Sequence, residues 1–201
     1  MKKTAKGKYG YLKYEKKKRT LITAVMFAIP LVIYITGLLQ TGTRKNMFTF
    51  VAIMGCLPAS RSAIGMILVL LQKPMQEALY RECQEHVRDL DVLYECVVSS
   101  EKRNTSIACI VLYGLNVICY SEDPKLNASE TETHIKKILQ GNGFRSNVKI
   151  FTEKKGFFRR VDELYALKQA GGEQIPFKPN EQYPDATREE LVAAVIKAVS
   201  V

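Results

Sequence analysis

The sequence predicts a membrane-anchored α+β protein, in which an N-terminal two-helix transmembrane hairpin precedes a small α/β domain of order α-β-β-β-α-β-α-α. Two long apolar runs near the N-terminus, residues 20–40 and 47–72, predict the hairpin. Short β-type runs and amphipathic helical patterns further along predict the domain. The 201 residues therefore divide into a basic tail of residues 1–19, the hairpin of residues 20–72, and one domain of residues 73–201.

The net charge of +10 invites a nucleic-acid-binding interpretation, but the distribution of charge argues against it. About 12 of the 30 basic residues precede residue 73, where Glu15 is the only acid, and the remainder of the chain is nearly neutral. Proteins bind DNA non-specifically largely because their basic side chains release counterions from the phosphate backbone. A nearly neutral domain gains little from this effect, so we do not expect nucleic acid as a partner.

The tail of residues 1–19 has the composition of a segment that lies against a membrane. It combines nine basic residues with three tyrosines, whose rings suit the membrane–water interface. Each Lys or Arg close to an anionic bilayer contributes about 1 kcal/mol of binding free energy. We therefore expect Lys16, Lys17, Lys18 and Arg19 to contact anionic lipid headgroups. The alternative is an arm that binds nucleic acid.

Residues 20–40 form an uncharged run that is long enough for one transmembrane helix. At 1.5 Å per residue, about 21 residues cross a hydrocarbon core of roughly 30 Å. A cleaved signal peptide would have a shorter apolar core and a small-residue cleavage site, and this run has neither. Pro30 removes one backbone donor near the middle, so we expect it to kink the helix.

Residues 47–72 are also long enough to span a membrane, yet Pro58 and Arg61 lie near the centre of this run. Two geometries remain open: a single kinked helix whose Arg61 faces protein or water, or two half-helices separated at residues 58–61. An arginine at the middle of a bilayer costs on the order of 3 kcal/mol, so we expect Arg61 to find water, a lipid headgroup or a partner. Arg61 and Pro58 are therefore candidate functional residues of the hairpin. The alternative is a snorkelling side chain or a contact within an oligomer.

The positive-inside rule predicts the topology of the hairpin. Nine basic residues precede the first span, whereas only Arg44 and Lys45 lie in the link between the spans. The N-terminus is thus expected in the cytoplasm, and two spans return the chain to the same side. We predict a multi-pass membrane protein with both termini cytoplasmic and a cytosolic domain.

The first half of the domain is predicted as a helix and three strands. An amphipathic pattern indicates a helix over residues 74–88, and β-type runs follow at residues 92–99, 105–113 and 116–121. The gaps between these runs are short enough for hairpins, so the strands should form an antiparallel meander. The middle run is continuously apolar, which is typical of a strand covered on both faces.

A helix and a strand follow the meander. Ser129 and Glu132 form a capping box that predicts the start of the helix, and Gly141 or Gly143 predicts its end. Residues 148–151 form a strand that is reached through this helix, so it should run parallel to its neighbour.

Two more helices complete the predicted domain. The first contains Phe157 and ends before Gly171. A proline-containing strap, residues 173–185, leads to the last helix, which Thr187 and Glu190 cap. The apolar face of this last helix must be buried against the domain or against a partner.

The strands at residues 105–112 and 116–121 are the basis of a family resemblance. The order helix, three-strand meander, helix, strand over residues 74–151 resembles the core of restriction-endonuclease-like proteins, in particular the nuclease-related domain often found beside membrane segments. In that family an Asp opens the second core strand and an E-x-K triplet lies on the third. The carboxylates hold a divalent metal, and the Lys helps to polarise the attacking water.

The residues of this chain at the comparable positions lack that chemistry. Ala108 stands where the Asp belongs, Cys119 where the Glu belongs, and Ser121 where the Lys belongs. A hard cation such as Mg²⁺ needs oxygen ligands, whereas Ala offers none and Cys is a soft ligand. The resemblance therefore implies a catalytically dead relative, and we expect neither a metal nor a cofactor.

Three functional hypotheses follow. The leading one is a non-enzymatic, membrane-anchored interaction module that binds a protein partner or a second copy of itself. The first alternative is a membrane-tethered, metal-dependent nuclease or hydrolase that uses Asp123 and Lys125, which form a D-x-K sequence, together with Glu95. The second alternative is a small subunit of a membrane complex that acts through its transmembrane hairpin.

The cysteines and histidines show no spacing typical of a metal site. Because no two of the five cysteines form a C-x-x-C pair, we expect them to be small buried residues in a reducing compartment. His86 and His134 are single residues on amphipathic helices, and neither has a nucleophile nearby in sequence. We expect both at the surface of the domain.

Overall fold

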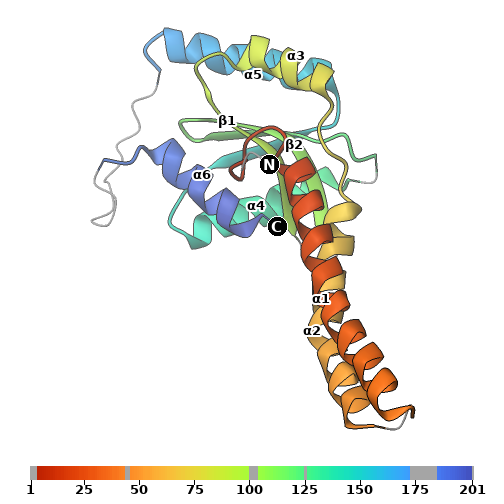
Figure 1. Cartoon of the computed structure of the whole chain (residues 1–201). Coiled ribbons are helices and arrows are strands. Elements are labelled where there is room, and N and C mark those ends of the chain that lie inside the picture. The colour runs from red at the N-terminus through yellow and green to blue at the C-terminus, as the bar shows by residue number, and fades with distance from the viewer. Residues whose placement is uncertain (1–3, 44–45, 100–103, 125, 173–184, 201) are drawn as a thin grey trace. The chain divides into compact units, whose positions relative to one another are not determined.

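The structure, a computed structural model, describes residues 4–43, 46–99, 104–124, 126–172 and 185–200 (Figure 1). The chain forms two compact units. One unit, Leu12–Lys73, is a helical hairpin. The other unit joins Met1–Tyr11 to Pro74–Val201 in an α/β domain. The N-terminal segment thus belongs to the domain, although the whole hairpin separates the two in sequence.

The hairpin consists of α1 (Tyr11–Thr41) and α2 (Met47–Leu70), each long and apolar enough to cross a membrane. α1 starts at Tyr11 instead of at residue 20, so the basic residues next to the apolar run are helical. Glu15 supports this extension, because its carboxylate pairs with Arg19 one turn later at 2.9 Å. α2 is continuous through Pro58, which confirms the single-helix geometry.

The domain has the predicted order of elements. They are α3 (Glu77–Val87), β1 (Asp91–Ser99), β2 (Asn104–Tyr113), β3 (Asn116–Tyr120), α4 (Ala128–Gly141), β4 (Asn147–Phe151), α5 (Lys154–Gln169) and α6 (Arg188–Val199). The strands form one sheet in the order β1-β2-β3-β4. β1, β2 and β3 are antiparallel neighbours, and β4 runs parallel to β3. The meander and the parallel strand reached through α4 are therefore confirmed.

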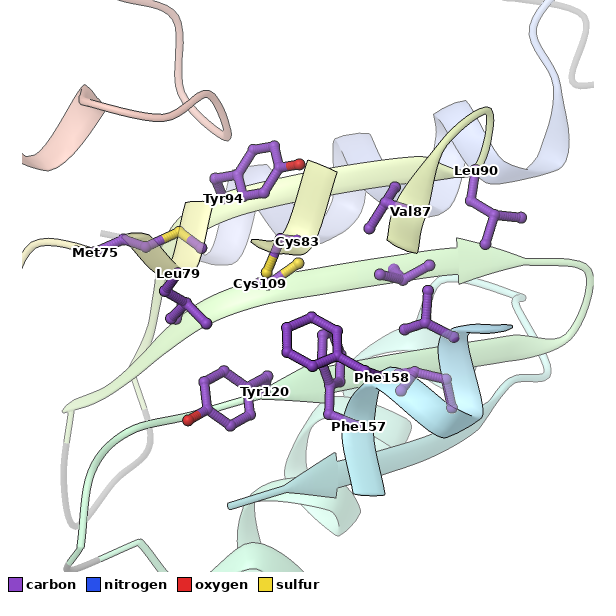
Figure 2. Packing of buried hydrophobic residues seen from close by; sticks show 14 of the residues in the cluster. Met75, Leu79, Cys83, Val87, Leu90, Tyr94, Cys109, Tyr120, Phe157 and Phe158 are labelled. Carbon is purple, nitrogen blue, oxygen red and sulfur yellow. The ribbon is translucent and has the colours of Figure 1, made fainter. Parts of the chain in front are cut away.

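Helices cover both faces of the sheet, so the domain has three layers (Figure 1). α3 and α5 bury Cys83 and Phe157 on one face, and α4 and α6 bury Leu139 and Val192 on the other. Figure 2 shows side chains of α3 pointing from the helix toward the strands. Because both faces are covered, every residue of β2 from Ile107 to Leu112 is buried, as its apolar run predicts.

The start of α4 differs from the prediction. Asn127, and not Ser129, caps the helix, because the Asn127 Oδ1 accepts a hydrogen bond from the Glu130 N–H at 3.3 Å. Asn and Ser are about equally good caps, so the sequence alone does not choose between them. Glu132 has another role: its Oε1 accepts a hydrogen bond from the Ile150 N–H of the edge strand β4 at 2.8 Å. The predicted capping box of Ser129 and Glu132 is therefore wrong.

α6 begins with the predicted capping box of Thr187 and Glu190. Its apolar face lies on the sheet, where Val192 and Ile196 are buried. Arg188 at its first position donates hydrogen bonds to the carbonyl oxygens of Gly114, in the turn between β2 and β3, and of Arg145, just before β4, so it fixes the helix to both segments. The predicted strap lies outside the described residues, except for its last residue.

Residues 4–10, which we call the arm, pack on the outer edge of β1. The Tyr94 N–H donates a hydrogen bond to the Gly7 carbonyl oxygen at 2.9 Å, and Lys6 donates to the Ser200 carbonyl oxygen. The Tyr9 ring stacks on Tyr80 with centroids 4.1 Å apart. Gly7 has a φ of 84°, a conformation that residues with a Cβ seldom adopt. The sequence predicts this segment only as a lipid-facing tail, so its place in the domain is a new finding.

Candidate functional site

Small residues bring the two hairpin helices into close contact. A Cβ added at Gly37 of α1 would lie 2.3 Å from the Phe48 Cβ of α2, so only glycine fits there. Farther along, the Thr23 Oγ1 lies 3.0 Å from the Ser62 Oγ. Small residues and hydroxyl pairs are typical of helix interfaces in membranes, where close packing replaces the hydrophobic effect.

These contacts fix the register of the hairpin and the level of Arg61. Thr23 lies beside Ser62, and the Arg19 Nη1 lies 3.5 Å from the Gly65 carbonyl oxygen. Arg61 is therefore about 6 Å from the start of the uncharged run of α1, at 1.5 Å per residue. Arg61 lies at the centre of the apolar run of α2. In the hairpin, however, it lies near the end that carries the basic residues Lys16–Arg19 of α1. The reason is that the apolar run of α2 extends past the start of the uncharged run of α1.

An open groove of about 330 Å³ lies on the hairpin at this level. Its lining comes from both helices and comprises Arg19, Ile22, Pro58, Arg61, Ser62 and Gly65. Both candidate residues of the hairpin that the sequence singles out, Pro58 and Arg61, thus lie in one groove. Arg19, which the sequence predicts only as a lipid-facing residue, joins them there.

The two arginines of the groove differ in their partners. The Arg19 Nε donates a hydrogen bond to the Glu15 carboxylate at 2.9 Å, and the Lys18 ammonium lies 3.9 Å from the same carboxylate. Lys16 donates to the Leu70 carbonyl oxygen at 3.0 Å, whereas Lys17 is exposed. Among the residues that the structure describes, none forms a hydrogen bond or an ion pair with the Arg61 guanidinium. The charge of Arg61 is therefore not compensated within the described hairpin.

In the domain, Glu95 is the most unusual of the predicted site residues. Its side chain is 3% exposed, and its φ of 52° is positive. The ladder between β1 and β2 is interrupted there, because Tyr94 and Cys96 are paired but Glu95 is not. The Glu95 Oε1 accepts a hydrogen bond from the Met75 N–H at 3.1 Å. Glu95 thus holds the first residues of the domain after the hairpin.

The three residues of the hydrolase alternative lie on different parts of the sheet. Glu95 is in β1, while Asp123 follows β3 and donates its N–H to the Ser121 Oγ at 3.3 Å. β2 lies between β1 and β3, which separates the two backbones by two strand spacings, or about 10 Å. Lys125 lies outside the described residues.

The positions comparable to the nuclease motif lie inside the folded domain. Ala108 is 8% exposed, and both Cys119 and Ser121 are 0% exposed. The Ser121 Oγ donates a hydrogen bond to the Ser106 carbonyl oxygen at 2.6 Å, so it connects β3 to β2. All three side chains pack or bond within the domain.

The two histidines contact neighbouring elements. The His86 Nδ1 of α3 lies 3.0 Å from the Asp162 carboxylate of α5, and its ring stacks on Phe158 with centroids 4.5 Å apart. His86 and Asp162 are both partly exposed, and together they connect the two helices on one face of the sheet. The His134 Nε2 lies 3.1 Å from the Ser99 carbonyl oxygen. Both arrangements are those of surface contacts between elements.

The thiols of the domain are protected from reaction. Cys83, Cys96, Cys109 and Cys119 are buried, as predicted, whereas Cys56 on α2 is exposed. Burial raises the pKa of Cys96 to about 11 and also raises the pKa of Cys109 and Cys119. These three thiols, Cys96, Cys109 and Cys119, therefore remain protonated at neutral pH and are poor nucleophiles. Within the described part of the chain, no group of three or more His, Cys, Asp or Glu residues is placed to hold a metal ion.

Two features of these sites were not predicted from the sequence. The role of Glu95 had a signal, because it is a charged residue inside an otherwise apolar run. For the contact of Gly7 with Tyr94, the glycines around Tyr9 are the only hint in the sequence. They do not indicate which residue of the domain this segment would contact. Comparisons of the chain with models of protein families, with curated proteins and with solved structures find no match.

Proposed function

We propose that the protein is a non-enzymatic interaction module anchored in a membrane by the α1–α2 hairpin. The distribution of exposed apolar side chains carries the proposal. Among the described residues, every exposed large hydrophobic side chain except Leu167 lies between Leu21 and Leu71. A helix in the core of a soluble protein would be mostly buried, yet only 17% and 11% of the most apolar windows of α1 and α2 are buried. A bilayer is the solvent that suits such a surface.

The arm supports a topology in which both ends of the chain lie on one side of the membrane. Gly7 precedes the hairpin and bonds to Tyr94, which follows it. Two spans between these residues satisfy this contact, whereas one span would place them on opposite sides. The excess of basic residues before α1 then assigns that side to the cytoplasm.

The surface of the domain indicates the kind of partner. The sequence leaves open whether the apolar face of α6 meets a partner, but this face is used inside the domain, where Val192 and Ile196 are buried. Leu167 is the one exposed large hydrophobic side chain among the described residues of the domain. A protein partner, or a second copy of the chain, would therefore recognise the domain through polar contacts.

The non-enzymatic part of the proposal rests on the burial and the hydrogen bonds of the candidate catalytic residues. Ala108, Cys119 and Ser121 are buried, and the Glu95 carboxylate is bound to the Met75 N–H. A catalytically dead relative of the nuclease-related domain would have these properties. The alternative of a metal-dependent nuclease or hydrolase, with Glu95, Asp123 and Lys125, has less geometric support.

A nuclease assay tests the non-enzymatic proposal. We expect the full chain in proteoliposomes to leave fluorescent DNA and RNA intact in the presence of Mg²⁺ or Mn²⁺. Glu95→Gln and Asp123→Asn serve as matched variants, because both keep side-chain size. Metal-dependent cleavage that falls in these variants would establish the hydrolase alternative.

Cross-linking in native membranes separates the domain from the hairpin as the interacting part. Lys136 and Lys137 are exposed on α4, so a lysine-reactive reagent should connect them to a discrete partner. Adducts restricted to Lys16–Lys18 would instead favour a small subunit that acts through its hairpin. The groove that contains Arg61 is the observation that favours this second candidate.

A further inference from the structure

The groove on the hairpin joins two guanidinium groups from different helices. Arg19 comes from α1 and Arg61 from α2, and both line the same open volume of about 330 Å³. This volume is at the lower end of the range of about 300–1,000 Å³ that small-molecule sites occupy. Ile22 and Pro58 add apolar walls beside the two positive charges. The groove therefore suits a ligand that is anionic at one point and apolar around it.

The charges around the groove leave a positive excess. Glu15 is the acid beside it, and its carboxylate is already shared by Arg19 and Lys18. The Arg61 guanidinium has no ion-pair or hydrogen-bond partner among the described residues. An arginine beside apolar surface needs a counter-charge or water, because its desolvation is costly. An anion in the groove would supply that counter-charge.

The level of the groove indicates which anion is available. Arg61 lies about 6 Å inside the start of the uncharged run of α1, at 1.5 Å per residue. If the hairpin spans a bilayer, this level lies just inside the boundary between the hydrocarbon core of roughly 30 Å and the headgroup layer, and a long arginine side chain can reach that boundary. Lipid phosphates lie at this boundary, and a guanidinium binds phosphate through paired, charge-assisted hydrogen bonds.

We infer that the groove between Arg19 and Arg61 binds the phosphate of an anionic phospholipid. The acyl chains of this lipid would lie on the exposed apolar side chains of the hairpin. A zwitterionic lipid fits less well, because its ammonium group would meet the two guanidinium groups of the groove and the Lys18 ammonium beside Glu15. The inference rests on the proposed insertion of the hairpin and names a ligand for it.

Lipid binding to the purified full chain in non-ionic detergent tests the inference. The number of bound lipids is measured by native mass spectrometry during titration with dioleoylphosphatidylglycerol or dioleoylphosphatidylcholine. We expect one saturable phosphatidylglycerol site that binds about ten-fold more weakly in Arg61→Gln, because a charge-assisted hydrogen bond is lost. Arg61→Lys should retain part of the affinity, since it keeps the charge but not the paired donors.

Two further variants separate a built site from general attraction between charges. Lys17→Gln removes one positive charge on the same part of the hairpin but outside the groove, and it should change the affinity less than two-fold. Gly65→Leu keeps the net charge but puts a side chain against Arg19, since a Cβ at Gly65 would lie 3.1 Å from the Arg19 Nη1. We expect Gly65→Leu to weaken phosphatidylglycerol binding.

Three results would overturn the inference. These are equal losses in Arg61→Gln and Lys17→Gln, equal binding of phosphatidylcholine, and displacement of the lipid by millimolar inorganic phosphate, which would assign a free-phosphate site. A thermal melt by circular dichroism confirms that each variant folds. Failure of membrane insertion itself would appear separately, as labelling of Cys56 by a water-soluble maleimide in vesicles.

Discussion

At the scale of single residues, Glu95 combines a positive φ of 52° with a buried charge. Each feature is unfavourable for a residue of this type, so the surroundings must stabilise both. The irregular backbone also changes the alternation of β1: Leu93 and Cys96 pack in the same cluster although they are three residues apart. As a result, Tyr94 donates its N–H to the arm while Glu95 binds the Met75 N–H.

Replacing Glu95 tests this role. We expect Glu95→Ala to lower the free energy of unfolding by about 1–3 kcal/mol, because the buried Met75 N–H loses its acceptor. Urea unfolding of the full chain in detergent, followed by circular dichroism, measures the change. Glu122→Ala, at an exposed glutamate, is the control and should stay within about 0.5 kcal/mol. Equal effects of the two substitutions would contradict a structural role for the carboxylate.

Asp91 gives the domain a predictable pH dependence. Partial burial raises the pKa of this carboxyl, and nearby Glu189 and Glu190 raise it further against the opposing effect of Lys168 and Lys197. The folded state therefore favours the protonated form. The contribution of Asp91 to stability is full below the unfolded pKa, near 3.8, and is lost as the pH rises through the higher folded pKa.

Asp91→Asn should therefore stabilise the protein at pH 7, where the ionised carboxylate is unfavourable. The gain should disappear below pH 3.8, where the wild-type side chain is already neutral. Urea midpoints of both proteins at the two pH values measure this difference. A variant less stable than wild type at pH 7 would indicate that attraction to Lys168 and Lys197 outweighs desolvation.

At the scale of elements, Gly37 allows α1 and α2 to approach each other closely. We expect Gly37→Ala to loosen the hairpin, because the new Cβ would meet the Phe48 Cβ at 2.3 Å and a backbone-attached atom cannot swing aside. Gly55→Ala is the matched control, since its Cβ would lie 3.2 Å from Pro30 and alanine favours helix. Titration with sodium dodecyl sulfate should unfold the Gly37 variant first. Similar midpoints for the two variants would contradict this packing.

The elements themselves were largely predictable, because helix and strand periodicities are local signals. The order of the domain elements and the parallel β4 followed from such patterns. The predicted helix starts were wrong where two local signals compete, or where a charged pair extends a helix beyond its apolar run. Asn127 and Ser129 are both good caps, and Glu15 with Arg19 supports a helix start that an apolar pattern does not register.

At the scale of the whole molecule, Cys56 reports whether the hairpin lies in a bilayer. It is exposed on α2, so a water-soluble maleimide should label it readily in the absence of a membrane. In proteoliposomes we expect no labelling, because hydrocarbon surrounds the thiol. Ser129→Cys, exposed on α4, is the positive control. Equal labelling of both positions in vesicles would contradict insertion.

The same reagent tests the topology in intact cells. We expect Thr43→Cys, in the link of the hairpin, to react from outside and Ser129→Cys to react only after lysis. Reaction of Ser129→Cys in intact cells would reverse the assignment of sides.

The sequence could not predict the contacts that assemble these elements. The groove forms because Thr23 of α1 lies beside Ser62 of α2. The arm is held on the domain by the hydrogen bond between Gly7 and Tyr94. Both contacts join residues far apart in the chain, and neither leaves a periodic signal. Single residues such as Arg61 were recognisable because a charge in an apolar run is costly, but their neighbours were not.

The bond between Gly7 and Tyr94 also sets an order for assembly during synthesis. Gly7 leaves the ribosome before the hairpin, whereas Tyr94 follows both spans. Closing a flexible loop costs entropy that grows with the logarithm of its length. Packing of the hairpin brings the Lys16 Nζ within 3.0 Å of the Leu70 carbonyl oxygen and so shortens the loop that remains to be closed. We therefore expect the spans to pair first and the domain to complete its sheet edge afterwards, at the membrane.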